Sequence, residues 1–400
     1  MIYGKIGRYE IKDNNQPLIM TVINISPESF FKGSIKNTDN LSENIHKAIN
    51  EGADIIDIGA ASTAPPEYGT PPITREEELR RIKNALQEIL EINTEFSIDT
   101  MHSEVAEYAL KKGVRIINDV SGLKNDTNMA KVIADYDAYI IIMACKNAPG
   151  DVGKIYEIKT ELRKSIDIAI KAGIDPEKII IDPGIGFGKP YEQDLEIIQK
   201  LQQFRTINKP ILVGVSRKSF IGKVLENVPP EKRLFGSLSA TAIAVYNGAH
   251  IIRTHDTKET YDVVRIAYSI KPKIQYMEDI ELLTWLHEPA DAEEVMIDIG
   301  VQPEGAKIMK NKMRVLPILL RNVQTPAATI IKEEMLALGG DAATHSGTVD
   351  CFVKTADILI LGTDIHIKRL IKKLSKMPYF NLDRISTKLR TLIKQVENYE

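Results

Sequence analysis

Short apolar runs alternate with longer helical patterns between residues 18 and 254, and this alternation limits the possible folds more than any other feature of the chain. Each run is rich in β-branched residues and almost continuously apolar, which is typical of parallel strands covered on both faces. The runs are Leu18–Asn24, Asp54–Gly59, Glu95–Asp99, Arg115–Asp119, Ala138–Ala144, Lys178–Asp182, Pro210–Ser216 and His250–His255. Eight βα units over about 260 residues predict an α/β fold, the (β/α)8 TIM barrel.

Polar residues stand at or just after the ends of these runs. They are Asn24, Asp57, Asp99, Asn118, Asp119, Asp182, Ser216, Lys218, Arg253 and His255. In a barrel the C-terminal strand ends meet at one mouth, so these side chains would share a pocket. A doubly wound open sheet would gather ligands at one switch point and leave several of these ends without a common role. The pattern therefore favours the barrel.

One part of this polar set combines carboxylates with an amide: Asp99, Asn118 and Asp182. A carboxylate accepts two parallel hydrogen bonds from a planar pair of donors, and an Asn beside it both donates and accepts. This combination suits a pterin or purine-like ring. The alternative is that Asp119 and Asp182 only cap the turns after their strands, as aspartates commonly do.

The other part is cationic and consists of Lys218, Arg253 and His255, to which Asn24 and Thr63 could add neutral contacts. Arg holds an oxyanion with two hydrogen bonds and Lys acts as a point charge, so the set suits a phosphate-bearing substrate. His255 can act either as a proton donor or only as a hydrogen-bond donor. A Mg²⁺ ion that arrives with substrate phosphates and touches one protein oxygen, such as that of Asn24, fits this set.

The glycine-rich stretch from Gly184 to Lys189 matches neither a nucleotide P-loop nor a dinucleotide fingerprint in its spacing. Its glycines instead indicate a tight turn that lets a ligand approach the backbone. The formal net charge of −3 and the interspersed charges predict no binding of nucleic acid. No long apolar segment is present, so we expect a cytoplasmic protein without a membrane span. Cys145 and Cys351 are expected to be buried thiols.

The pattern changes after Lys271-Pro272-Lys273, which predicts a first domain over residues 1–275 and a smaller α/β domain over 276–400. The expected strands of the second domain are Glu294–Ile299, Arg314–Leu320 and Ala356–Gly362, and its expected helices are Pro326–Leu338 and His366–Lys376. Nothing in this segment indicates a reaction.

The segments around these polar residues resemble dihydropteroate synthases over about residues 18 to 270. The segments are Met20–Phe30, Gly52–Gly59, Ser62-Thr63, Ile98–Thr100, Ile117–Gly122, Asp182–Lys189, Ser216–Phe220 and Arg253–Asp256. The resemblance implies a pterin-binding TIM barrel. It also implies a reaction in which 4-aminobenzoate joins (7,8-dihydropterin-6-yl)methyl diphosphate by an SN1-like route. It also implies Mg²⁺, a homodimer and a sulfonamide target.

The resemblance also implies residue roles. Asp99, Asn118, Met143, Asp182 and Lys218 match the pterin pocket, and Thr63, Arg253 and His255 match the diphosphate site. Phe187 and Ser219 match the 4-aminobenzoate side, and Asn24 matches the magnesium position. The catalytic set would be Asp99, Lys218, Arg253 and His255, with Asp99 stabilising the developing positive charge.

Several residues depart from the family pattern. Ala61 and Ala64 replace a Glu and an Arg around Ser62-Thr63, Met143-Ala144-Cys145 replaces Met-His-Met, and Ser26-Pro27-Glu28 replaces Thr-Pro-Asp. Two alternatives therefore stay open, namely a pterin-binding methyltransferase and a pterin-binding paralogue without catalysis. A methyltransferase has no need of the cations in Ser216-Arg217-Lys218 and Arg253-Thr254-His255, so the sequence favours the synthase.

Overall fold

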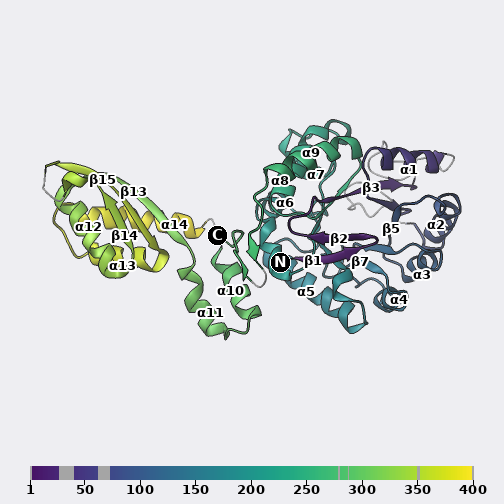
Figure 1. Ribbon diagram of the computed structural model, residues 1–400, viewed down its shortest axis with the longest axis horizontal. Helices are drawn as coiled ribbons and strands as arrows, with labels where there is room; N and C mark the ends of the chain where they lie inside the picture. The colour runs from purple at the N-terminus through teal and green to yellow at the C-terminus, as the bar shows by residue number, and fades with distance from the viewer. Residues whose placement is uncertain are drawn as a thin grey trace. The chain divides into compact units, whose positions relative to one another are not determined.

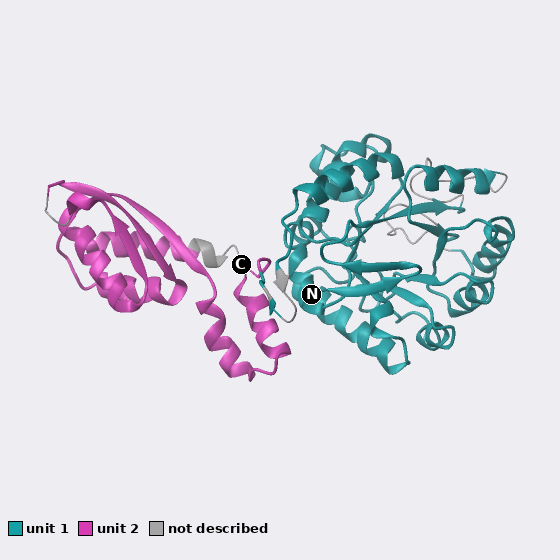
Figure 2. Ribbon diagram, in the orientation of Figure 1, with its two compact units in different colours: residues 1–283 teal, residues 284–400 magenta. Residues whose placement is uncertain are grey.

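The computed structural model describes residues 2–26, 40–61, 73–277, 280–286, 288–348 and 352–398. The chain divides into two compact units, Met1–Leu283 and Thr284–Glu400 (Figure 2). None of the described helices is both long and apolar enough to cross a membrane.

The first unit is the predicted (β/α)8 barrel. Its strands are β3 (Leu18–Asn24), β4 (Ile55–Gly59), β5 (Glu95–Asp99), β6 (Ile116–Asp119), β7 (Tyr139–Met143), β8 (Ile179–Asp182), β9 (Leu212–Gly214) and β10 (Ile251–Thr254). They form one parallel sheet in the order β8-β7-β6-β5-β4-β3-β10-β9. The sheet closes where the Ile181 amide donates to the Pro210 carbonyl at 2.9 Å. Closure brings all eight C-terminal strand ends to one side, which we call the mouth.

A ring of helices surrounds the strands (Figure 1). The helices are α1 (Leu41–Asn50), α2 (Arg75–Ile89), α3 (Ser103–Lys111), α4 (Met129–Asp135), α5 (Ile155–Lys171), α6 (Tyr191–Gln199), α7 (Ser219–Val224), α8 (Leu234–Tyr246) and α9 (Thr257–Ile270). The longer amphipathic helices bury an apolar stripe at helical spacing; in α2 the stripe contains Ile82, Leu86 and Ile89. These stripes and the outward-facing strand residues form the main core.

A short antiparallel hairpin, β1 (Tyr3–Ile6) and β2 (Tyr9–Lys12), covers the end of the barrel opposite the mouth. Ile6 and Ile11 pack there in one buried cluster with residues from the early parts of the strands, among them Met20, Ile55 and Ile116. The hairpin therefore seals the bottom of the barrel and leaves the mouth as its open end.

The second unit is an α/β unit around a three-stranded antiparallel sheet in the order β13-β15-β14. The strands are β13 (Val315–Gln324), β14 (Asp341–Thr344) and β15 (Thr355–Thr363). The helices are α10 (Pro289–Asp298), α11 (Pro303–Met309), α12 (Thr325–Leu338), α13 (Asp364–Leu374) and α14 (Leu382–Asn398). A separate apolar core joins this sheet to α12, α13 and α14.

The prediction of a strand over Glu294–Ile299 was wrong, because this segment lies mostly in α10. Pro289 occupies the first helical position, where its missing N–H costs nothing, and the helix continues through the apolar residues that the sequence pattern assigned to a strand. The other predicted strands and helices of this unit correspond to β13, β15, α12 and α13.

Candidate active site at the mouth of the barrel

Strand register places the carboxylate and amide residues side by side. Asp99, the last residue of β5, pairs with Asn118 in β6, and Met143 of β7 pairs with Asp182 of β8. Asp57 lies two residues before the end of β4, and Arg253 lies in β10 next to Gly214 of β9. All four acidic or amide side chains, those of Asp57, Asp99, Asn118 and Asp182, are at most 7% exposed.

The Arg253 guanidinium lies between two buried carboxylates. Its Nε donates to Asp57 Oδ2 at 2.7 Å, and its Nη2 donates to Asp99 Oδ2 at 2.8 Å. Asp57 Oδ2 also accepts from Asn118 Nδ2 at 3.4 Å. One cation thus serves two anions, and the residue that we expect to bind the diphosphate is tied to the residues that we expect to bind the pterin.

Because Arg253 is shared with Asp57, it does not fully offset the negative charge of Asp99. Burial raises the pKa of Asp99 to about 7, the nearby Arg253 opposes that rise, and the Asp57 carboxylate adds to it. Asp99 Oδ1 and Asp57 Oδ1 are buried and have no hydrogen-bond partner among the described residues. A buried carboxylate oxygen without a donor is costly, so a ligand that presents N–H groups to Asp99 would gain from this site.

Asp182 begins the glycine-rich loop and binds its backbone. Its Oδ1 accepts from the Gly184 amide at 2.7 Å, so the expected turn-capping role is present at this residue. Burial raises the pKa of Asp182, and the nearby Lys218 opposes the rise. Gly186 has a φ of +74°, and a Cβ there would stand 2.3 Å from Lys218 Cδ. Only glycine therefore permits both the turn and the position of Lys218.

Lys218 links the glycine-rich loop to an apolar wall. Its Nζ donates to the Ile185 carbonyl and lies 4.3 Å from the centroid of the Phe187 ring. Burial lowers the pKa of Lys218 to about 8, and the Asp182 carboxylate opposes that fall. Phe187 and Met143 are buried in one apolar cluster with Val120, against which Met101 packs. The mouth thus combines an apolar wall with a cation over an aromatic face.

His255 is held by Ser216 at the end of β10. Ser216 Oγ accepts from the His255 amide at 3.2 Å, lies 3.1 Å from His255 Nδ1, and donates to Asp256 Oδ2 at 3.4 Å. Burial and the cations Arg253, Arg217 and Lys218 keep the pKa of His255 well below its usual range. The ring is therefore neutral near pH 7 without a ligand.

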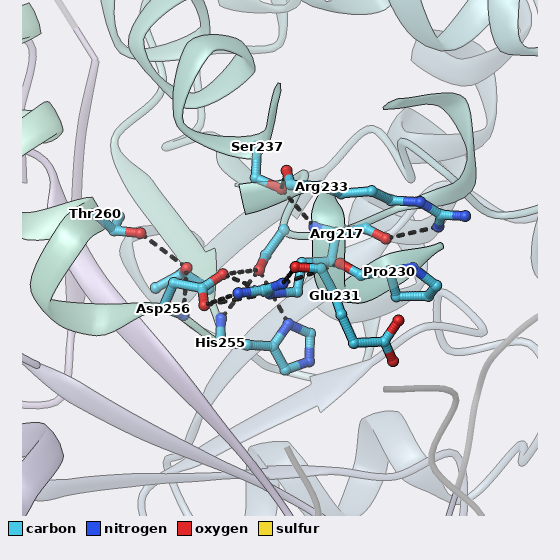
Figure 3. Close-up of polar contacts among 10 residues, drawn as sticks. Arg217, Pro230, Glu231, Arg233, Ser237, His255, Asp256 and Thr260 are labelled. Atoms are coloured by element: carbon cyan, nitrogen blue, oxygen red, sulfur yellow. Dashed lines mark hydrogen bonds and ion pairs between the residues drawn. The ribbon is translucent and has the colours of Figure 1, made fainter. Parts of the chain in front are cut away.

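Arg217 lies beside Asp256, the residue after His255, and has a structural role (Figure 3). Its Nη2 donates to Asp256 Oδ1 at 2.7 Å, and its Nη1 donates to the carbonyls of Pro230 and Glu231 at 2.9 and 3.0 Å. Arg233 in turn donates to the Arg217 carbonyl at 2.9 Å. Arg217 thus fixes the loop after β9, with Asp256 as its ion-pair partner.

The remaining predicted site residues have different positions. Asn24 ends β3 and is partly exposed, while Ser219 begins α7 beside Lys218. Thr63, like Ala64, Pro27 and Glu28, lies outside the described residues. Asp119 is structural, because its carboxylate accepts from the amides of Ser121 and Leu123. Cys145 is buried, as expected, and burial raises the pKa of its thiol to about 11; Cys351 lies outside the described residues.

The sequence predicted that Asp57 belongs to the shared pocket but gave it no specific role, and it did not predict that Ser216 holds His255. A signal for Asp57 existed, since it is the one charged residue in the otherwise apolar strand Ile55–Gly59. The described residues contain no cluster of three or more His, Cys, Asp or Glu side chains that could hold a metal ion.

Comparison with known proteins agrees with this geometry. Residues 20–255 match the sequence profile of the family described as "Pterin binding enzyme". The dihydropteroate synthase of Clostridium beijerinckii is 38% identical over 258 residues, which cover 64% of this chain and 94% of that protein. The dihydropteroate synthase of Bacillus subtilis is 36% identical over 244 residues, which cover 60% and 84% of the two chains.

Solved structures give the same result. A dihydropteroate synthase from Clostridium difficile, crystallised in the presence of pteroic acid, is 39% identical with a TM-score of 0.60, covering 66% of this chain and 99% of the other. A dihydropteroate synthase from Coxiella burnetii in complex with pteroic acid is 33% identical with a TM-score of 0.60, covering 68% and 99%.

The fold and the family match define the class of this protein as a pterin-binding (β/α)8 enzyme. Within that class, the chain belongs to the dihydropteroate synthase family.

Proposed function

We propose that this enzyme joins 4-aminobenzoate to (7,8-dihydropterin-6-yl)methyl diphosphate and releases 7,8-dihydropteroate and pyrophosphate, a step of folate biosynthesis. One observation carries the proposal: the carboxylate and amide set and the cationic set share one mouth, joined through Arg253. The substrate has matching parts, a ring edge with N–H donors and a diphosphate with several negative charges.

Asp99, Asn118 and Asp182 would bind the pterin edge, with Met143 packing against the ring and Lys218 on its other side. The C–O bond between the methylene carbon and the diphosphate breaks first, and the electron pair leaves with pyrophosphate. The amine nitrogen of 4-aminobenzoate then attacks the pterin-methyl cation and loses a proton. Ionised Asp99 stabilises that cation, and the cation in turn offsets part of the cost of the buried Asp99 charge.

Arg253, His255 and Thr63 would bind the departing diphosphate. Nδ1 of His255 faces the Ser216 hydroxyl at 3.1 Å, which leaves Nε2 as the ring nitrogen for a diphosphate. A diphosphate nearby favours the charged imidazolium, because an adjacent anion raises the pKa of a histidine. His255 would then donate from Nε2 to the leaving group. Phe187 and Ser219 would border the site for 4-aminobenzoate.

Asn24 suits a Mg²⁺ ion that arrives with the diphosphate. Its Oδ1 lies 3.0 Å from the place where a Cβ on Gly59 would stand, so the glycine leaves room for this side chain. A single amide oxygen agrees with magnesium that is held mainly by water and substrate phosphates. When bound, the ion would help to neutralise the leaving diphosphate.

A pterin-binding methyltransferase and a non-catalytic pterin binder remain the competing functions. A methyltransferase has no need of Arg253 between two carboxylates beside His255, and product formation separates the synthase from the non-catalytic binder. The cytoplasmic location, the homodimer and the absence of nucleic-acid partners remain predictions from the sequence and the family.

Cooperative ligand binding distinguishes these functions. Calorimetry would measure the affinity for 6-hydroxymethyl-7,8-dihydropterin with and without pyrophosphate and Mg²⁺. A synthase should bind the pterin more tightly when pyrophosphate occupies the cationic set, since pyrophosphate then competes for Arg253 and leaves Asp99 more available to the pterin edge. A methyltransferase should show no effect of pyrophosphate.

A further inference from the structure

Asp57 is a fully buried carboxylate that the proposed reaction does not use directly. It lies in β4 with 0% exposure, below the layer of Asp99 and Asn118, and so it cannot touch a ligand in the mouth. A carboxylate in such a place persists only with partners that compensate its charge.

Its partners are both residues that we expect to bind substrate. Asp57 Oδ2 accepts from Arg253 Nε at 2.7 Å and lies 2.7 Å from Arg253 Nη2. The same oxygen accepts from Asn118 Nδ2 at 3.4 Å. Asp57 thus contacts one residue of the pterin set and one residue of the diphosphate set.

Asp119 offers a comparison within the same barrel. It is equally buried, at 1% exposure, but its carboxylate accepts from Ser121 and Leu123 of its own loop. Asp119 therefore stabilises a local turn, whereas the described partners of Asp57 come from two other strands of the barrel.

The arrangement also has a consequence for substrate binding. In the ligand-free site Arg253 is shared by Asp57 and Asp99. When a pterin edge takes the Asp99 carboxylate, Asp57 is the anion that still holds the guanidinium. The Arg253 side chain is 18% exposed, so part of it remains open to the mouth and to a diphosphate.

We propose that Asp57 is a positioning residue, which orients Arg253 toward the diphosphate and keeps Asn118 in place for the pterin. This inference rests on the proposed synthase function. Without Asp57, Arg253 would pair with Asp99 alone. The residues that bind the pterin and the diphosphate would then no longer be positioned by one carboxylate.

The test compares Asp57→Asn with the matched control Asp119→Asn in the full-length enzyme. Asp57→Asn should raise KM for the pterin diphosphate about tenfold or more, because a charge-assisted hydrogen bond is lost, and should change KM for 4-aminobenzoate less than about twofold. Asp119→Asn should lower the unfolding temperature without this selective change. If Asp57→Asn does not fold, the smaller Asp57→Ser carries the same test.

A double-mutant cycle with Arg253→Lys separates positioning from a purely structural role. Lys lacks the Nε donor, so Asp57→Asn should add less than about threefold to KM in the Arg253→Lys background. Two results would overturn the inference. One is a KM for the pterin diphosphate in Asp57→Asn equal to that of the wild type, and the other is the full tenfold effect of Asp57→Asn in the Arg253→Lys background. If the wild-type enzyme makes no dihydropteroate, the proposed function fails, and pyrophosphate affinity of Asp57→Asn by calorimetry then decides the positioning role alone.

Discussion

Arg253 Nη2 donates to Asp99 Oδ2 at 2.8 Å, so one ion pair joins the cation of the proposed diphosphate site to the carboxylate of the proposed pterin site. A substrate that takes both partners exchanges this ion pair for hydrogen bonds from the pterin edge to Asp99 and an ion pair between the diphosphate and Arg253. We therefore expect the two parts of the substrate to bind cooperatively, and the following consequences can be measured.

Asp99→Asn should lower kcat/KM about 10- to 100-fold, because it removes the charge that stabilises the pterin-methyl cation and one partner of Arg253. Stability should change little, since the wild-type carboxylate is itself undercompensated. Steady-state kinetics and thermal unfolding check both points, and an unchanged kcat/KM would remove Asp99 from the mechanism.

The pH dependence of turnover should reflect the pKa of Asp99, which burial raises to about 7. Activity needs the carboxylate, so kcat/KM of the wild type should fall as pH drops below about 7, and this pH dependence should be absent in Asp99→Asn. The stability of the folded enzyme should depend on pH in the opposite direction. The folded-state pKa lies above the ordinary 3.8, so wild-type stability relative to Asp99→Asn should fall as pH rises from about 4 through 7.

His255→Gln should make the enzyme less sensitive to acid. The pKa of His255 is lowered from 6.5 by burial and neighbouring cations, so the unfolded chain binds the proton more readily. Wild-type stability should therefore fall relative to the variant as pH drops below 6.5. Denaturant titrations at pH 7.5 and 5 measure this difference, and parallel curves at both values would contradict it.

Gly186→Ala should abolish pterin binding, because the new methyl group would meet Lys218 Cδ in a left-handed backbone position. Gly248→Ala is the matched control, since Gly248 also has a positive φ but nothing lies within 4 Å of its added Cβ. Both variants should lose about 1–2 kcal/mol of stability from backbone strain. Retained pterin affinity in Gly186→Ala would show that Lys218 is not required in its present position.

Ala64→Arg should tighten the binding of the pterin diphosphate by about tenfold, because it restores a cation that the family pattern has in this loop. Ala64→Gln is the control for side-chain length without charge. Equal affinity of Ala64→Arg and wild type, measured by calorimetry with Mg²⁺, would mean that the loop contact is supplied elsewhere.

The sequence predicted the barrel and much of the site because strand ends converge by geometry. Asp99 and Asn118 could be placed together once β5 and β6 were known to be neighbours. The ion pair between Asp57 and Arg253 could not be predicted, since it depends on side-chain direction across strands about 200 residues apart in the chain. The β1–β2 hairpin was missed because its two strands have only four residues each.

The most direct test of the proposed function is an assay with (7,8-dihydropterin-6-yl)methyl diphosphate, 4-aminobenzoate and Mg²⁺, in which dihydropteroate and pyrophosphate are both quantified. We predict that the two products form in equal amounts and that a chelator of divalent metal ions lowers the rate. Tight binding of the pterin without either product would contradict a synthase and favour a pterin-binding protein without this activity.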